Sequence, residues 1–130
     1  MLLSVAESKG IKSDLIPRIA TGFCSGIART SGMCGAISGG IMAIGLFTGR
    51  SSPHETVADC YDRVRDLIGR FQTKYGSTDC EVLTGCDLDT DEGMQKFEAG
   101  NLLGQCVLYA EEVTKMVMEI LDDNDTDDRR

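Results

Sequence analysis

The segment of residues 32–49 constrains the possible fold more strongly than any other part of this sequence. It reads GMCGAISGGIMAIGLFTG, so it carries no charge and is dense in small residues. Glycine disfavours an α-helix by roughly 1 kcal/mol relative to alanine. A helix with this many glycines therefore indicates that another backbone or a cofactor comes very close to it. We expect a buried central helix here, with Gly32, Gly35 and Gly39 as the positions that leave room for a cofactor.

A membrane-spanning helix is the weaker interpretation of the same segment. The uncharged run from Thr30 to Gly49 has about the length of a span, which needs roughly 20 residues. The run is rich in glycine, however, and no second apolar segment accompanies it. We therefore expect no membrane insertion.

Capping signals divide the rest of the chain into helices. Ser13 is a candidate N-cap for a helix whose apolar positions step by three and four, namely Ile16, Ile19, Phe23 and Ile27. Ser52, Pro53 and Glu55 have the pattern of a helix start with a capping box. The amphipathic stripe that follows consists of Val57, Tyr61, Val64, Ile68, Phe71 and Tyr75. A second capping box, formed by Thr78 and Glu81, opens a short helix.

The pattern of the whole chain predicts an all-α fold. Further helices are expected at residues 2–8 and at about 101–121, and no segment has the period of two that is typical of a strand. We predict a compact bundle of about five helices around the Gly-rich central helix, forming a single domain over residues 1–121. Residues 122–130, which read DDNDTDDRR, have the composition of a disordered acidic tail.

The net charge of −8 limits the classes of partner. Nucleic acid and anionic membranes are bound through lysine and arginine patches, so we expect neither as a partner. Met1 is not followed by the basic region and long apolar stretch of a secretory signal, so we expect a cytoplasmic protein. Thiols stay reduced in the cytoplasm. The six cysteines therefore indicate metal binding, cluster binding or redox catalysis rather than structural disulfides.

Cys34 is the most informative of these cysteines. It lies at the start of the Gly-rich helix, where free N–H groups and the helix dipole stabilise a thiolate and lower its pKa. The thiolate is both the reactive and the metal-binding form, so we expect Cys34 to be a catalytic residue or a ligand. Cys80 repeats this arrangement in the first turn of the helix after Thr78. Cys106 lies on the apolar stripe of the last helix and becomes a third ligand or redox partner if it meets Cys34 and Cys80.

The other candidates have weaker signals. Cys24 precedes Cys34 by ten residues and could share its site. Cys86 follows Cys80 at a spacing too loose to indicate zinc by itself. Cys60 neighbours the apolar face of its helix, and we expect a structural role for it. The one histidine of the chain lies in a capping sequence, which leaves Cys–His nucleophilic catalysis without support.

Short motifs spread over nearly the whole chain form a recognisable combination. They are Ile19-Ala20-Thr21-Gly22-Phe23, Gly26-Ile27-Ala28-Arg29, Cys34-Gly35-Ala36-x-x-Gly39, Tyr75-Gly76-Ser77, Cys80-x-x-Leu83-Thr84-Gly85 and the late Cys106. Together they resemble the C-GCAxxG-C-C family of redox-active proteins. The resemblance implies that Cys34 is the cysteine of the Gly-rich motif and that Cys80 and Cys106 are the two late cysteines of the family.

The chain departs from the family pattern at one cysteine. The upstream cysteine of the family has no counterpart before Cys24, so either the chain is truncated or Cys24 or Cys86 takes its place. The family also resembles part of the split-Soret cytochromes c. This chain has no Cys-x-x-Cys-His motif, so no covalent haem is implied.

Three functions fit these observations. The first is a redox protein that binds an iron–sulfur cluster or metal through Cys34, Cys80 and Cys106, with Cys24 or Cys86 as a fourth ligand. The second is a metal-free thiol–disulfide oxidoreductase, in which Cys34 attacks and Cys80 or Cys106 resolves the mixed disulfide. The third is a non-catalytic helical assembly module. The first two need a redox partner protein whose identity the sequence leaves open, and the long apolar stripes also fit a homodimer.

Overall fold

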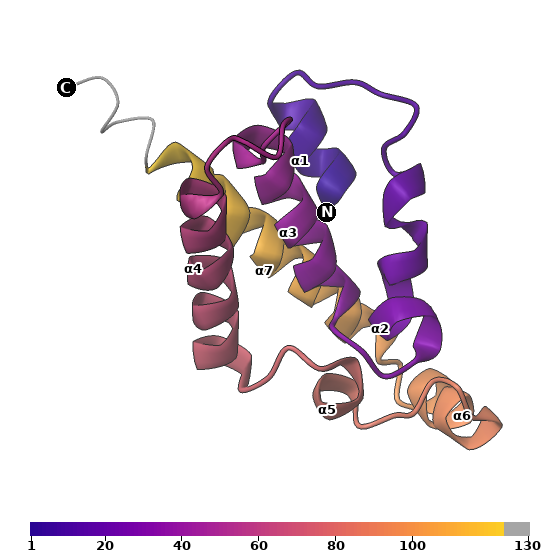
Figure 1. Ribbon diagram of the computed structural model, residues 1–130. Coiled ribbons are helices and arrows are strands. Elements are labelled where there is room, and N and C mark those ends of the chain that lie inside the picture. Colours follow the sequence, from indigo (N-terminus) through magenta and orange to yellow (C-terminus); the bar gives the residue numbers. More distant parts are fainter. Residues whose placement is uncertain (124–130) are drawn as a thin grey trace.

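The computed structural model describes residues 1–123 and confirms the all-α class, with more helices than the sequence predicts. Seven α-helices and one 3-10 helix follow one another along this part of the chain (Figure 1). Their bounds are α1 Leu2–Ser8, η1 Arg18–Phe23, α2 Cys24–Arg29, α3 Gly35–Thr48, α4 Ala58–Tyr75, α5 Cys80–Thr84, α6 Asp91–Ala99 and α7 Leu103–Asp122. Residues 124–130, most of the predicted acidic tail, lie outside the described residues, and Asp122 belongs to α7 rather than to a tail.

The Gly-rich helix α3 is the central helix, as predicted, and packs against α1, α4 and α7 (Figure 1). Its glycines permit close packing on two sides. A Cβ atom at Gly40 would come within 2.7 Å of Val113 in α7 and 2.8 Å of Leu67 in α4. A Cβ atom at Gly39 would instead touch Met1, at 3.6 Å. None of the helices in residues 1–123 is long and apolar enough to cross a membrane.

Helices α4 and α7 supply much of the buried core around α3. In α4, Phe71 of the predicted stripe is fully buried, but Tyr61 of the stripe is exposed and the fully buried Leu67 lies outside it. Val113 and Val117 of the α7 stripe are fully buried. Helix α4 ends where the sequence predicts, at Gly76, whose φ of 84° is left-handed. The C-terminal ends predicted for the two long helices, α4 and α7, are therefore close to those observed.

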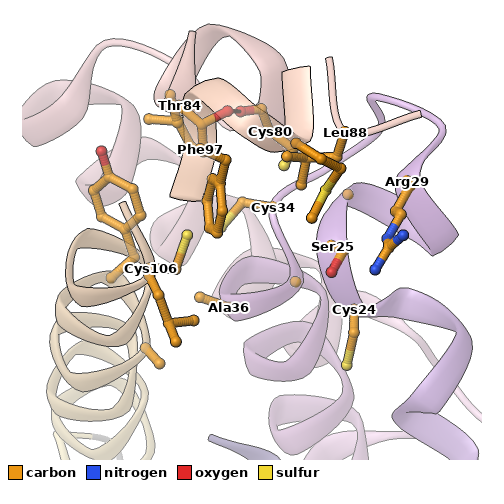
Figure 2. Close-up of a pocket in the computed structure, with 17 residues that line it drawn as sticks. Cys24, Ser25, Arg29, Cys34, Ala36, Cys80, Thr84, Leu88, Phe97 and Cys106 are labelled. Atoms are coloured by element: carbon orange, nitrogen blue, oxygen red, sulfur yellow. Dashed lines mark hydrogen bonds between the residues drawn. The ribbon is translucent and has the colours of Figure 1, made fainter. Parts of the chain in front are cut away.

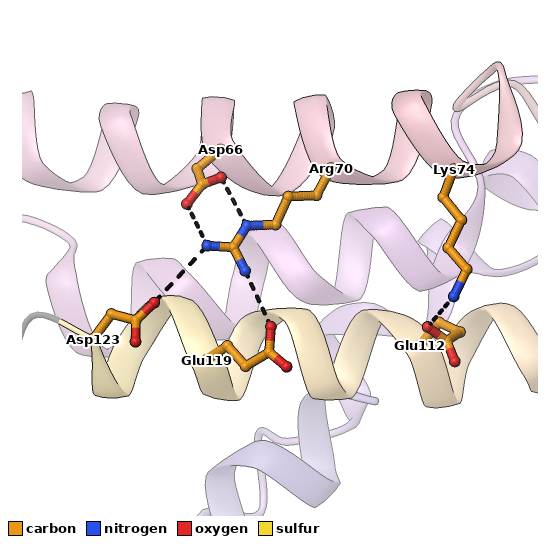
Figure 3. A network of polar contacts seen from close by, with 6 residues as sticks. All are labelled: Asp66, Arg70, Lys74, Glu112, Glu119 and Asp123. Carbon is orange, nitrogen blue, oxygen red and sulfur yellow. Dashed lines mark hydrogen bonds and ion pairs between the residues drawn. The ribbon is translucent and has the colours of Figure 1, made fainter.

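Charged residues tie α4 to α7 outside this core (Figure 3). Arg70 of α4 donates two hydrogen bonds to Asp66 and one to Glu119 of α7, which lies 3.1 Å away. Lys74 pairs with Glu112 of α7 at 2.7 Å. These pairs align the two helices along their exposed edge.

The predicted helix that begins after Ser13 is wrong. The chain forms only a 3-10 turn, η1, followed by the short α2, and three of the four predicted apolar positions are exposed: Ile19, Phe23 and Ile27. Pro17 lies inside the predicted helix, where it lacks an N–H group and disfavours helical geometry at Ile16. Periodicity alone therefore overestimates helix here.

The predicted helix start at Ser52 is also misplaced, because α4 begins at Ala58. The capping residues do form hydrogen bonds, but within a separate turn. The Ser52 hydroxyl accepts from the His54 N–H, and the Glu55 carboxylate accepts from the Ser51 N–H. The side chains that usually start a helix are used here to close the loop before it.

Candidate functional site

A single antiparallel bridge joins the start of α3 to the start of α5. Met33 pairs with Asp79, so that the Cys34 N–H donates to the Thr78 carbonyl at 2.7 Å and the Cys80 N–H donates to the Gly32 carbonyl at 2.9 Å. Side chains alternate between the two faces of such a pair. Cys34 and Cys80 therefore lie on the same face as diagonal neighbours, with Cα atoms about 7–8 Å apart.

This face opens on a cavity of about 320 Å³ (Figure 2). The cavity lies between the ends of α3 and α7 on one side and α5 and α6 on the other. Its lining includes four cysteines, namely Cys24, Cys34, Cys80 and Cys106. Most of the remaining lining is apolar, so the thiols face a largely apolar space.

Three of the lining cysteines, namely Cys34, Cys80 and Cys106, each lie at the start of a helix. Cys34 is the N-cap residue of α3 and Cys80 is the first residue of α5, where the Asp79 carboxylate accepts from the Val82 N–H. Cys106 lies in the first turn of α7 and is half-buried, whereas Cys34 and Cys80 are buried. In Figure 2, Cys34 lies between Cys80 and Cys106.

The three thiols influence one another electrostatically. Burial raises the pKa of Cys80 to about 11, and the neighbouring Cys34 and Cys106 add to the shift. Burial, and then Cys34, also raises the pKa of Cys106. The expectation that a helix start lowers the pKa is therefore wrong for Cys80. The loss of hydration outweighs the dipole of α5, which is only five residues long.

Gly26 makes room for the Cys80 thiol. A Cβ atom at Gly26 would lie 2.5 Å from the Cβ atom and 3.0 Å from the Sγ atom of Cys80. Gly26 belongs to α2, whose residues 25–29 all have positive φ, so this element is a left-handed turn and not a right-handed α-helix. Sequence reasoning missed this turn, because apolar spacing does not report the hand of the backbone. The only sequence signal is Gly26 itself.

The glycines predicted to bind a cofactor have different surroundings. Gly35 lines the cavity, and a Cβ atom there would meet the backbone of Phe23 at 3.2 Å and of Cys24 at 3.3 Å. Gly32 faces the Ile27 side chain. Gly39 faces α1 and does not line the cavity. Gly35 is thus the predicted glycine that lies at the site.

The remaining cysteines differ in their relation to the cavity. Cys24 lines its edge but is exposed, and its sulfur faces the Ala20 carbonyl at 3.9 Å. Cys86 is buried beside Cys80 in a small apolar cluster and lies outside the cavity lining. Cys60 packs against the main core, away from the cavity. Within residues 1–123, no group of three or more His, Cys, Asp or Glu side chains is arranged to hold a single metal ion.

Residues 1–120 match the model of a protein family described as "Putative redox-active protein (C_GCAxxG_C_C)". The chain belongs to the C_GCAxxG_C_C family. No curated protein and no solved structure matches the chain. The three cysteines that match the C_GCAxxG_C_C pattern, Cys34, Cys80 and Cys106, all line the cavity, and Cys24 lines its edge.

Proposed function

We propose that Cys34, Cys80 and Cys106 bind an iron–sulfur cluster in the cavity and that the protein transfers electrons. The observation that carries this proposal is the meeting of three thiols, from three different helix starts, at one cavity of about 320 Å³. Thiolates are the usual protein ligands of iron–sulfur clusters. Membership of a redox-active family supports the same class of chemistry.

The three thiols supply the donor chemistry that such a group needs, but within residues 1–123 they are not arranged to hold a single metal ion, so binding would require them to move closer together. Ionising Cys80 and Cys106 beside Cys34 is unfavourable in the metal-free protein, because the thiolates are poorly hydrated and repel one another. Iron cations would remove both costs, since a coordinated thiol is deprotonated outright. When bound, a cluster supplies a site for reversible one-electron transfer. The chain itself would hold the thiolates and surround the group with apolar side chains, and the absence of a side chain at Gly26 leaves room for Cys80.

A metal-free disulfide mechanism fits the geometry less well. Two cysteines whose Cα atoms lie more than about 7 Å apart cannot form a disulfide without backbone movement. The diagonal position of Cys34 and Cys80 places them near or beyond this limit. The raised pKa of Cys80 also keeps it protonated near neutral pH, which slows its attack on a disulfide.

Anaerobic reconstitution with iron and sulfide tests the proposal. We expect a brown protein with a broad visible absorption band, equal amounts of iron and labile sulfide, and bleaching on reduction. A protein that stays colourless and iron-free would contradict the proposal. Thiol titration across redox buffers tests the alternative, in which Cys34 is the attacking thiol. If a reversible disulfide forms between two cavity cysteines and no iron binds, the metal-free mechanism replaces the cluster.

A further inference from the structure

The cavity has a cationic side that the proposed function does not use. The sequence has 21 acidic residues and a net charge of −8. None of the acidic side chains in residues 1–123 lines the cavity, and the charged residue that does line it is Arg29. Arg29 is exposed and forms no ion pair within residues 1–123, so a guanidinium without a carboxylate partner lies at the solvent-facing edge of this mainly apolar cavity. The guanidinium attracts anions to this side of the cavity, whereas the Asp79 carboxylate acts on the Cys80 thiol from another side.

The polar groups on this side of the cavity are free to bind a ligand. Within the described chain, neither the Arg29 guanidinium nor the Ser25 hydroxyl makes a hydrogen bond or ion pair. The Thr84 hydroxyl, by contrast, is already bonded to the Cys80 carbonyl at 2.8 Å. Ser25 and Arg29 are both donors, and a carboxylate accepts from two donors at once.

A left-handed turn presents Ser25 and Arg29 together. All five residues from 25 to 29 have positive φ, and Gly26 is the one glycine among them. Left-handed geometry costs a residue other than glycine roughly 1–2 kcal/mol. The turn is held by the Gly32 N–H, which donates to the Gly26 carbonyl at 2.9 Å, and by the Thr30 hydroxyl, which donates to the Ile27 carbonyl at 2.7 Å. Such strained segments cluster at ligand sites.

Apolar side chains from a cap, formed by α5, α6 and the loop between them, complete the site. Leu83, Leu88 and Phe97 line the cavity together with Arg29. Figure 2 shows Arg29 and Cys106 on opposite sides of the view, with Cys34 and Cys80 between them. A ligand with an apolar body and one acidic group would therefore contact the cap with its body and Arg29 with its charge.

We propose that this cavity binds a small organic carboxylate, whose acidic group is held by Arg29 and Ser25 and whose apolar body lies against Phe97. The proposal goes beyond electron transfer, because it depends on the wall of the cavity and not on iron. A cavity of about 320 Å³ is at the lower end of the sizes that small-molecule sites show. The ligand is therefore small, of the size of a single ring with a short acidic chain.

The test uses two probes of equal shape, 3-phenylpropionate and its neutral amide, with the full-length, metal-free chain under reducing conditions. Binding is measured by calorimetry and by NMR shifts of residues around the cavity. We expect the carboxylate to bind about tenfold or more tightly than the amide, because charge-assisted hydrogen bonds are stronger than neutral ones. Equal binding of acid and amide to the unaltered protein would overturn the proposal.

Matched arginine variants locate the charge that matters. Arg29→Gln and Arg18→Gln each remove one positive charge, but Arg18 lies in η1 and does not line the cavity. We expect Arg29→Gln to weaken binding of the carboxylate about tenfold and Arg18→Gln to leave it within about twofold. Equal weakening by both variants would overturn the proposal, since it would assign the effect to overall charge. Because iron is absent, these results do not depend on whether the cluster forms.

Discussion

Cys34 and Cys80 are diagonal neighbours across a bridge of one residue pair, Met33 with Asp79. The bridge fixes both backbones through two hydrogen bonds and leaves both thiols on the face that opens on the cavity. Cys106 reaches the same cavity from α7. Three segments that are far apart in the sequence thus each place one thiol at the same cavity.

Gly26 should be indispensable for the position of the Cys80 thiol. The Gly26→Ala substitution would place a Cβ atom 2.5 Å from the Cys80 Cβ atom, at a φ of 66°. We expect the free energy of unfolding to fall by about 2 kcal/mol, from overpacking and left-handed strain. The control is Gly22→Ala, because Gly22 has no atom within 4 Å of its Cβ position. If urea denaturation gives equal values for the two variants, the contact with Cys80 is not important for stability.

Two glycines of α3 should respond in opposite directions to the same substitution. At Gly40 a Cβ atom would lie 2.7 Å from Val113 and 2.8 Å from Leu67, so Gly40→Ala should destabilise the protein by about 1–3 kcal/mol. At Gly45 the Cβ position is open, so Gly45→Ala should stabilise it by up to about 1 kcal/mol. Thermal denaturation of both variants checks this pair. A lower melting temperature for Gly45→Ala would contradict the packing of α3 described above.

The Cys80 thiol should make stability depend on alkaline pH. Its pKa is raised from 9.0 to about 11 by burial, so the unfolded chain loses this proton at a lower pH than the folded chain. Stability from this group is complete below pH 9 and declines as the pH rises toward about 11. We expect Cys80→Ala to flatten the pH dependence of unfolding between these values. Comparing the two proteins at each pH cancels the contribution of lysines and tyrosines, and parallel curves would exclude the effect.

The Arg70 network should contribute little stability despite its several bonds (Figure 3). Arg70 binds Asp66, Glu119 and Asp123 at a position where its side chain is one-third exposed. Exposed ion pairs are worth up to about 1 kcal/mol and are screened by salt. We expect Arg70→Ala to cost less than about 1 kcal/mol at low salt, and less at high salt. Arg65→Ala, which removes a more exposed pair at 3.5 Å, should be close to neutral. If Arg70→Ala loses more stability than this, and the loss does not change with salt concentration, then Arg70 stabilises the protein by packing and not by its charge.

The long helices were predictable because burial imposes a period on them. Phe71 in α4 and Val113 in α7 belong to apolar stripes that only a helix can bury on one side. The segment around Ile19 has the same spacing, yet it is exposed and forms a 3-10 turn. Pro17 disfavours helical geometry in this segment, although the apolar spacing predicts a helix. Spacing therefore predicts a helix reliably only where no residue opposes helical geometry.

The thiols of the candidate site could be predicted from the sequence, but the turn and the bridge that surround them could not. Sequence reasoning can identify Cys34, Cys80 and Cys106, because helix starts and the chemistry of cysteine can be recognised from residues that are close together in the sequence. The left-handed turn that carries Ser25 and Arg29 leaves almost no such signal, since four of its five residues lack the backbone freedom that glycine offers. The bridge between Met33 and Asp79 is a single pair and has no period to detect. These features follow from tertiary contacts, which is why only the structure reveals them.

The central claim is that Cys34, Cys80 and Cys106 act as one ligand set. The most direct test is the iron and labile sulfide content of single Cys→Ser variants after anaerobic reconstitution, with Cys60→Ser as the matched control because Cys60 packs away from the cavity. We predict that each of the three cavity variants loses most of its bound iron and sulfide, while Cys60→Ser retains the content of the unaltered protein. Equal iron in all four variants, or none in any protein including the unaltered one, would contradict the claim.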